Sequence, residues 1–171
     1  MARYQDALAL AAATRTTPNI NAVRTDEQEK FGFGVALEQE INKSVGLFAR
    51  AMWADGATET EAYATIDRSL SLGAVTHGDT WTRGQDTLGA AIAWNRLSAT
   101  NRDYLAAGGL DFFIGDGKIS YGVERIAEVF YNFNLFSTVW LTADFQRIAN
   151  PAYNSDRGPV SVSALRVHVE F

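Results

Sequence analysis

The end of the chain alternates between apolar and charged positions. In residues 160–171 the apolar positions end on Phe171, and Arg166, His168 and Glu170 lie between them. A period of two predicts a β-strand whose two faces meet different surroundings. The apolar face suits either the core of a soluble sandwich or the lipid-facing side of an outer-membrane barrel, whose lumen the charged face would line. A terminal aromatic residue is typical of the barrel.

The same alternation recurs upstream and predicts six further long strands, seven in all, with tight turns between some of them. The predicted strands cover residues 31–42, 45–55, 66–78, 87–98, 123–136, 138–149 and 160–171.

The connections between these strands differ in length in a regular way. They are short, long, moderate, long, short and long, at residues 42–44, 56–65, 78–86, 98–121, 136–137 and 150–159. Up-and-down barrels of the outer membrane have short turns at one end and longer loops at the other. A sandwich has no reason to place its long loops at one end, so the pattern favours the barrel.

Two helical segments are expected outside the strands. Residues 3–14 are rich in Ala and Leu and predict a short helix, followed by a polar loop at 16–30. We interpret residues 1–30 as a solvated outside loop and residues 31–171 as the barrel part. Residues 98–109 predict a capped helical turn with a glycine stop, and Gly115–Gly117 predicts a small hairpin.

Composition narrows the function classes. The chain has 171 residues, enough for one domain, and its net charge of −5 argues against nucleic-acid binding. The absence of Cys excludes disulfides and thiolate metal sites. No apolar run reaches the roughly 18 residues of a membrane helix, but barrel strands need only about 10 alternating residues.

The N-terminus and the strand count both depart from what an ordinary outer-membrane barrel protein shows. The first fifteen residues lack the hydrophobic core and cleavage site of a signal peptide, which an outer-membrane protein needs. An odd number of strands also departs from ordinary barrels. We therefore expect either a cytoplasmic chain or a fragment or processed form whose export signal lay upstream.

Several stretches of the sequence resemble a known protein family. The stretches YGVERIAEVFYNFNL and WLTADFQRIANPAYNSDRGPVSVSALRVHVEF are similar to the C-terminal end of the carbohydrate-selective porins of Gram-negative outer membranes. The upstream stretches FGFGVALEQEI, GLFARAMWADG, IDRSLSLGAV and YLAAGGLDFFIGDG resemble the same family. The resemblance covers residues 31–171 and is most specific in LTADFQRIANPAYN.

The resemblance implies an all-β fold, an antiparallel up-and-down transmembrane barrel of 16 strands, of which this chain would supply roughly the last seven. It implies a porin for passive diffusion of carbohydrates such as glucose, located in the outer membrane, without enzymatic activity or a cofactor. Its implied partners are mono- and oligosaccharides, outer-membrane lipid, and the barrel-assembly machinery through the strand that ends in Phe171. It also allows association into a homo-oligomer.

The candidate functional residues are charged side chains on the polar faces of the strands. Carboxylates and guanidinium groups suit sugar hydroxyls, which both donate and accept hydrogen bonds. The candidates are Glu38, Glu40, Arg50, Asp67, Glu124, Glu128, Asp144 and Arg166. Each could instead only hydrate a wide lumen or pair with a neighbour.

Aromatic residues fall into two expected groups. Phe48 and Trp81 could stack on pyranose rings. Others lie near strand ends, as the aromatic girdles of outer-membrane barrels do, and these are Trp53, Trp94, Tyr131 and Phe133.

Other chemistry is less well supported. Glu124 and Glu128 lie on one strand face but roughly 13 Å apart, whereas glycosidase carboxylates lie about 5 to 9.5 Å apart. Pairing of Glu128 with a carboxylate of a neighbouring strand stays open. His77 and His168 lie in different regions, and no metal site is expected. The alternative functions are a soluble, lectin-like β-sheet module, whose apolar faces would form a core, and a gene remnant that does not fold alone.

Overall fold

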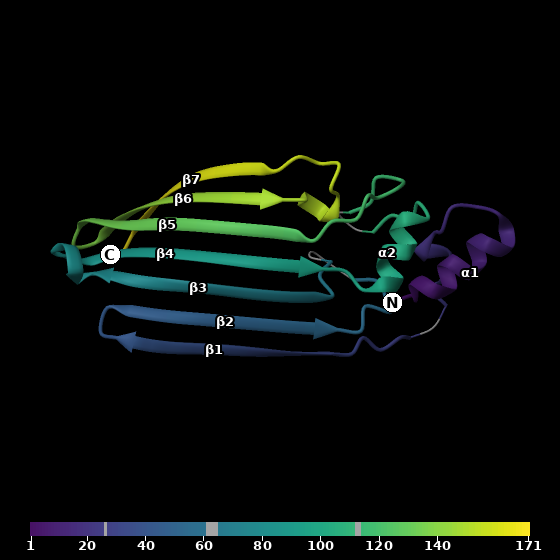
Figure 1. The fold of residues 1–171 in the computed structure, drawn as a ribbon, viewed down its shortest axis with the longest axis horizontal. Helices are drawn as coiled ribbons and strands as arrows, with labels where there is room; N and C mark the ends of the chain where they lie inside the picture. Colours follow the sequence, from purple (N-terminus) through teal and green to yellow (C-terminus); the bar gives the residue numbers. More distant parts are fainter. Residues whose placement is uncertain (26, 61–64, 112–113) are drawn as a thin grey trace.

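The computed structural model describes residues 1–25, 27–60, 65–111 and 114–171, and its main element is one antiparallel sheet of seven strands in chain order (Figure 1). The strands are β1 (Gly32–Asn42), β2 (Val45–Ala54), β3 (Arg68–Gly78), β4 (Arg83–Arg96), β5 (Glu124–Phe136), β6 (Val139–Ala149) and β7 (Val160–Val169). Each of the seven predicted strands is confirmed.

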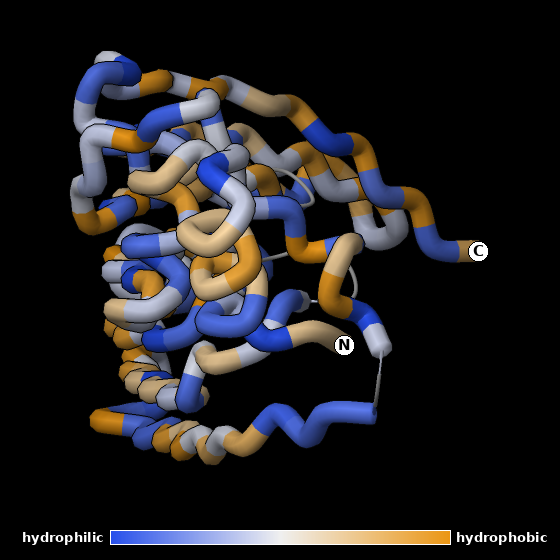
Figure 2. Tube along the Cα trace, turned by 90° about the vertical axis from the view of Figure 1, so that its right-hand side faces the viewer, coloured by the Kyte–Doolittle hydropathy of each residue, from blue (hydrophilic) through white to orange (hydrophobic). Residues whose placement is uncertain are grey.

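The sheet is open and curved. β1 pairs only with β2, and β7 only with β6, so these two strands are its edges. The end-on view shows the strands following an arc around the helical segments (Figure 2). The sheet is therefore a shell with a concave side and a convex side.

All long connections lie at one end of the shell, beside the helices, and all short turns lie at the other (Figure 1). One predicted connection, residues 78–86, is wrong. β4 already begins at Arg83, and the connection is the short turn η2 (Asp79–Trp81). The first residues of β4 were missed because Arg83–Asp86 is polar throughout and joins β3 through an irregular step after His77.

The register places the apolar residues in an oblique band on one face, because residues directly opposite each other share a face. Phe33, at the start of the band on β1, is level with Arg96 of β4. Leu165, at its start on β7, is level with Leu88, eight residues further along β4. Eight residues across six strand steps correspond to a slope of about 40°, which is the usual tilt of membrane-barrel strands. When the strands tilt by this angle, the apolar band therefore forms a belt at a constant height across all seven strands.

The long connections and the N-terminal segment before β1 fold into a cap with its own core. Helices α1 (Tyr4–Thr14) and α2 (Ala99–Ala106) and the short turns η1 (Ile20–Val23) and η3 (Pro151–Tyr153) contribute to it. The buried cluster consists of Ala2, Tyr4, Ala7, Ile20, Leu97, Tyr104, Leu105, Ile114, Ile119 and Tyr153.

The predicted N-terminal helix is confirmed, and most of the described residues of this segment are exposed, but several of its side chains are buried in the cap. Tyr4 and Ala7 of α1 are 1% exposed, and Ile20 of the following loop is 6% exposed, because they pack against α2 and the loops that follow β4 and β6. Alternation along the chain cannot reveal such a contact, because its partners lie in distant loops.

The helical turn predicted after β4 is confirmed as α2. Its N-cap is Ser98, whose hydroxyl accepts a hydrogen bond from the Asn101 N–H at 3.1 Å. The hairpin predicted around Gly115–Gly117 forms no strand ladder in the described residues, and residues 112–113 lie outside them. None of the described helices is both long enough and apolar enough to span a bilayer.

Candidate functional site

The polar face of the sheet is the concave one. At the loop end, Glu124 of this face accepts a hydrogen bond from the Ala152 N–H of the cap, and in the end-on view the cap falls inside the arc of the strands (Figure 2). The convex face is apolar and open. Phe33 is 61% exposed, Leu37 64% and Leu165 76%. A soluble sandwich would cover these side chains with a second layer, and none of the described residues forms one.

The predicted site residues fall mainly on the concave face. By register, this face carries Glu38, Glu40, Arg50, Glu124, Glu128, Asp144 and Arg166. Asp67 is different, because it lies just before β3 and is fully buried beneath the cap.

Asp67 and Glu124 hold the cap against the sheet. The Asp67 carboxylate accepts hydrogen bonds from the Ser98 N–H at 2.8 Å and from the Asn101 side-chain amide at 3.2 Å. Its other oxygen lies 3.7 Å from the Lys30 ammonium. Glu124 accepts hydrogen bonds from Asn95 at 3.1 Å and from the Ala152 N–H at 3.0 Å. Both carboxylates are thus engaged in structural contacts.

A first cluster of the concave face lies on β1–β3. The Phe48 ring covers Gly73, where an added Cβ would lie 2.3 Å from the ring. A side chain at position 73 would therefore displace the ring. The Arg50 guanidinium lies 5.4 Å from the Phe48 ring centre and donates to Glu38 at 3.3 Å. The result is an aromatic surface beside a solvent-exposed ion pair.

A second cluster lies on β4–β7 and repeats this arrangement. Phe130 covers Gly89, where an added Cβ would lie 2.3 Å from the ring. A depression of about 300 Å³ opens beside the ring. Its lining consists of Thr87, Glu128, Phe130, Asn132, Thr142, Asp144 and Arg166.

Polar groups in the second cluster are partly paired and partly open. Thr142 donates to Asn132 at 3.0 Å, and Gln146 donates to Glu128 at 3.3 Å. The carboxylates of Glu128 and Asp144 and the Arg166 guanidinium thus surround an aromatic ring with both acceptors and donors. A ligand with an apolar face and several hydroxyl groups fits this chemistry.

The ring-over-glycine pairs were missed from the sequence. Phe48 with Gly73 and Phe130 with Gly89 come from neighbouring strands, and only the register brings them together. Glycines at polar-face positions of otherwise regular strands were the available signal.

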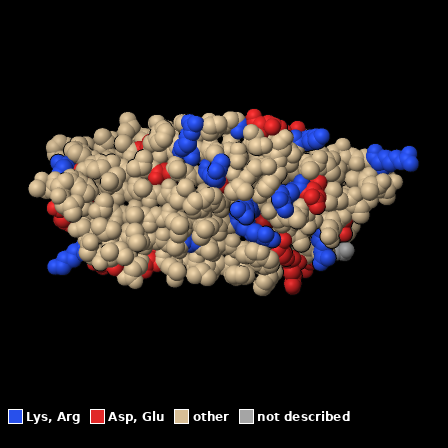
Figure 3. Space-filling model, in the orientation of Figure 1, with Lys and Arg blue, Asp and Glu red and all other residues tan. Residues whose placement is uncertain are grey.

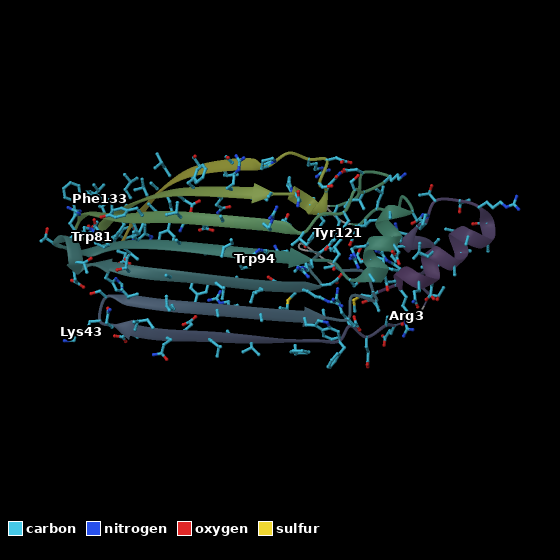
Figure 4. All side chains as sticks on the ribbon, viewed as in Figure 1. Arg3, Lys43, Trp81, Trp94, Tyr121 and Phe133 are labelled. Atoms are coloured by element: carbon cyan, nitrogen blue, oxygen red, sulfur yellow. The ribbon has the colours of Figure 1, made fainter. Side chains whose placement is uncertain are left out.

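Trp81 does not lie on the concave face, so its predicted stacking on sugars is wrong. Its indole N–H donates to the Tyr131 hydroxyl at 3.0 Å, and Tyr131 shares the apolar face with Leu88. Trp81 and Phe133 are found at the short-turn end, whereas Trp94 lies toward the loop end (Figure 4). The register places Trp53 toward the loop end as well. The aromatic residues therefore gather near both ends of the convex face.

Asp86 organises the short-turn end of this face. Its buried carboxylate accepts hydrogen bonds from Arg83 at 2.5 Å, the Tyr131 hydroxyl at 2.6 Å and the Asn134 N–H at 2.9 Å. Arg83 in turn lies 3.9 Å from the Phe133 ring centre. These contacts join the β3–β4 turn to β5.

Two further ion pairs stabilise the cap. Burial raises the pKa of Glu59, but hydrogen bonds from Arg24 and the Ala2 N–H outweigh it and hold that pKa below its ordinary value. A hydrogen bond from Asn154, together with the neighbouring Arg157, lowers the pKa of Asp116 despite some burial. Burial, with a nearby Asp111 carboxylate, raises the pKa of Tyr4. The Glu59 and Asp116 carboxylates are therefore charged and paired at neutral pH.

The structure bears on the two other kinds of site considered above, a carboxylate pair and a metal site, and it brings Glu128 beside Asp144 of β6. Glu124 is engaged with the cap, so it does not pair with Glu128. Within the described ranges, no group of three or more His, Asp or Glu side chains could hold a metal ion.

An open, tilted antiparallel sheet with an apolar convex belt, aromatic ends and a charged concave face defines a membrane β-barrel wall. The chain belongs to the carbohydrate-selective porin, OprB family, whose family model matches residues 1–171.

Two individual proteins are similar to the chain. The chain is 27% identical over 162 residues to Porin AaxA of Chlamydia pneumoniae, covering 95% of this chain and 32% of that protein. The fold is similar to the high-pH structure of Pseudomonas putida OprB, with a TM-score of 0.70, 20% identity, and coverage of 83% of this chain and 36% of the other. The chain thus spans about a third of the length of these relatives.

Proposed function

We propose that this chain forms the seven carboxyl-terminal strands of a 16-stranded outer-membrane porin, and that sugars diffuse along its concave face. The observation that carries the proposal is the pair of aromatic rings that lie over glycines among charged groups of the concave face. Family membership supports it independently.

The mechanism is passive exchange of hydration for wall contacts. A pyranose ring laid on Phe48 or Phe130 keeps its hydroxyl groups within reach of the surrounding charged groups. Each contact replaces a hydrogen bond to water at little net change in free energy, so sugars bind weakly and leave readily. No energy source or cofactor is required.

As part of a membrane barrel, the sheet would have further partners. The convex belt would contact outer-membrane lipid, and the strand that ends in Phe171 would contact the barrel-assembly machinery. The open edges β1 and β7 would pair with the remaining strands of the barrel. Association of barrels into homo-oligomers is compatible with this arrangement.

The first test is planar-bilayer conductance of the chain refolded in detergent, titrated with glucose and maltodextrins. Conductance steps that sugar blocks would support the proposal. Steps that sugar leaves unchanged would contradict sugar passage. Folded monomer in plain buffer, without conductance, would contradict the membrane location.

Sugar binding can also be measured without conductance, by NMR titration of the chain in micelles with a maltodextrin. We expect shift changes around Phe48 and Phe130. Phe130→Ala should weaken binding about tenfold, corresponding to about 1.4 kcal/mol. The matched variant Phe145→Ala, on the convex face of β6, should leave the affinity unchanged. Equal effects of both variants would contradict the site.

A further inference from the structure

A row of arginines crosses the convex face at the loop end. Arg68 of β3 lies directly opposite Arg96 of β4. Arg125 of β5 lies opposite Trp94, and Arg147 of β6 lies opposite Ala127. Because paired residues share a face, all four arginines project on the apolar side of the sheet. Figure 3 shows basic side chains crossing the sheet obliquely toward its loop end.

The row follows the edge of the apolar belt. Arg68 and Arg96 are level, and Arg125 and Arg147 are each displaced by two residues along the strands relative to the previous arginine. Four residues over three strand steps correspond to a slope of about 40°, the same slope that the apolar belt has. The four guanidinium groups therefore lie at one level of the membrane.

These arginines have no acidic partner. Throughout the described part of the chain, no Asp or Glu forms an ion pair with any of the four, and all four are exposed. Arg147 donates to the Ser161 hydroxyl at 2.7 Å. Elsewhere the chain pairs Arg24, Arg50, Arg83 and Arg157 with carboxylates. The row is thus a local concentration of uncompensated positive charge in a protein with a net charge of −5.

We propose that this arginine row (Arg68, Arg96, Arg125 and Arg147) binds the phosphate groups of anionic lipid headgroups at the loop-side edge of the bilayer. A guanidinium group binds phosphate through two parallel hydrogen bonds, and its aliphatic stem can lie along the apolar belt. Trp94, beside Arg125, supplies the amphipathic ring that membrane interfaces favour. The inference rests on the proposed function, because it requires the convex face to contact lipid.

The test measures which lipids contact the row in vesicles. The chain is inserted into phosphatidylcholine vesicles that contain a minor fraction of phosphatidic acid, and brominated acyl chains are placed on one lipid or the other. Quenching of tryptophan fluorescence then reports each lipid's contact with the protein. A variant that keeps only Trp94 localises the signal to the row, and the unsubstituted chain provides a second measurement if that variant does not fold.

We expect brominated phosphatidic acid to quench Trp94 more than its mole fraction predicts. An arginine near an anionic surface contributes about fivefold in binding, so R125Q/R147Q should reduce the enrichment by about tenfold or more. K43Q/K118Q removes the same charge at exposed sites away from the row and should leave the enrichment intact. R125K/R147K should retain only part of it, because Lys lacks the planar fork.

Three outcomes would contradict the proposal, and they are distinguishable. Equal quenching by both lipids, with neutral brominated lipid still quenching, would overturn the arginine-row proposal while the membrane location stands. Absence of quenching by either lipid would show that the convex face does not contact the bilayer, and would overturn both proposals. A loss of enrichment in K43Q/K118Q equal to that in R125Q/R147Q would overturn the specific site.

Discussion

Single buried carboxylates hold the ends of the shell together. Asp67 is fully buried and accepts two hydrogen bonds from the start of α2, with Lys30 beside it. Removing a buried carboxylate leaves its hydrogen-bond donors and its cation without a partner. The resulting loss of folding free energy exceeds the net stabilisation that the intact interaction contributes.

We expect Asp67→Ala to lower the free energy of unfolding by about 3 kcal/mol, because the Ser98 N–H, the Asn101 amide and Lys30 lose their acceptor. Urea unfolding of the chain in detergent micelles measures this loss. Asp103→Ala, at an exposed position of α2, is the control and should change stability little. A similar loss in both variants would contradict the structural role of Asp67.

We expect the stability of the cap to depend on pH through the Asp116 carboxyl group. Its folded pKa lies below the ordinary value of 3.8 because Asn154 and Arg157 bind the charged form. The contact therefore contributes stability above about pH 3.8, and this contribution is lost as the pH falls through the lower, folded pKa.

The Asp116 pKa can be followed by carboxyl-carbon NMR between neutral and acidic pH. Arg157→Gln removes one of the two partners, so we expect the Asp116 midpoint to rise toward 3.8. Arg15→Gln, an exposed substitution in the loop after α1, should leave the midpoint unchanged. A midpoint insensitive to Arg157→Gln would refute this account of the pairing.

At the scale of elements, the β3–β4 turn is held by Asp86 rather than by its own turn residues. The contacts of Asp86 run to Arg83 on the same strand and to Tyr131 and Asn134 on β5. These contacts tie the turn to the position of β5.

Asp86→Ala should destabilise the fold by about 3 kcal/mol, and Tyr131→Phe by about 1 kcal/mol. Because the two side chains share a hydrogen bond, the double variant should cost less than the two single losses added together. Unfolding in micelles of the two single variants and the double variant gives this coupling. Strict additivity would show that the contact contributes nothing to stability.

At the scale of the whole molecule, the two faces of the sheet should differ in how well they tolerate the same charged substitution. Ala90 and Ala91 are neighbours on β4, but Ala90 is level with Val129 on the convex face and Ala91 with Glu128 on the concave face.

We therefore expect Ala90→Arg to reduce the stability of the lipid-inserted chain by about 2–4 kcal/mol, whereas Ala91→Arg should cost about 1 kcal/mol or less. Unfolding from lipid vesicles by urea compares the two variants directly. A larger loss from Ala91→Arg would reverse the assignment of lipid and lumen to the two faces.

Alternation along the chain was sufficient to predict the strands, the antiparallel order and the end at which the long loops gather. Side chains on a strand alternate between faces with a period of two, so segments such as 31–42 and 160–171 identify their apolar and polar faces without any knowledge of their neighbours. The charged positions of the polar face, from Glu38 to Arg166, follow from the same rule.

The tertiary structure alone decided which side chains meet across strands and loops. Register sets these contacts, and a shift of one residue changes every neighbour. In the folded chain Phe48 lies over Gly73 and Phe130 over Gly89. Asp67 is buried beneath the cap, and Trp81 lies at the convex face. The local pattern determined the faces because they depend on adjacent residues, whereas the site depends on residues that pairing brings together from separate strands.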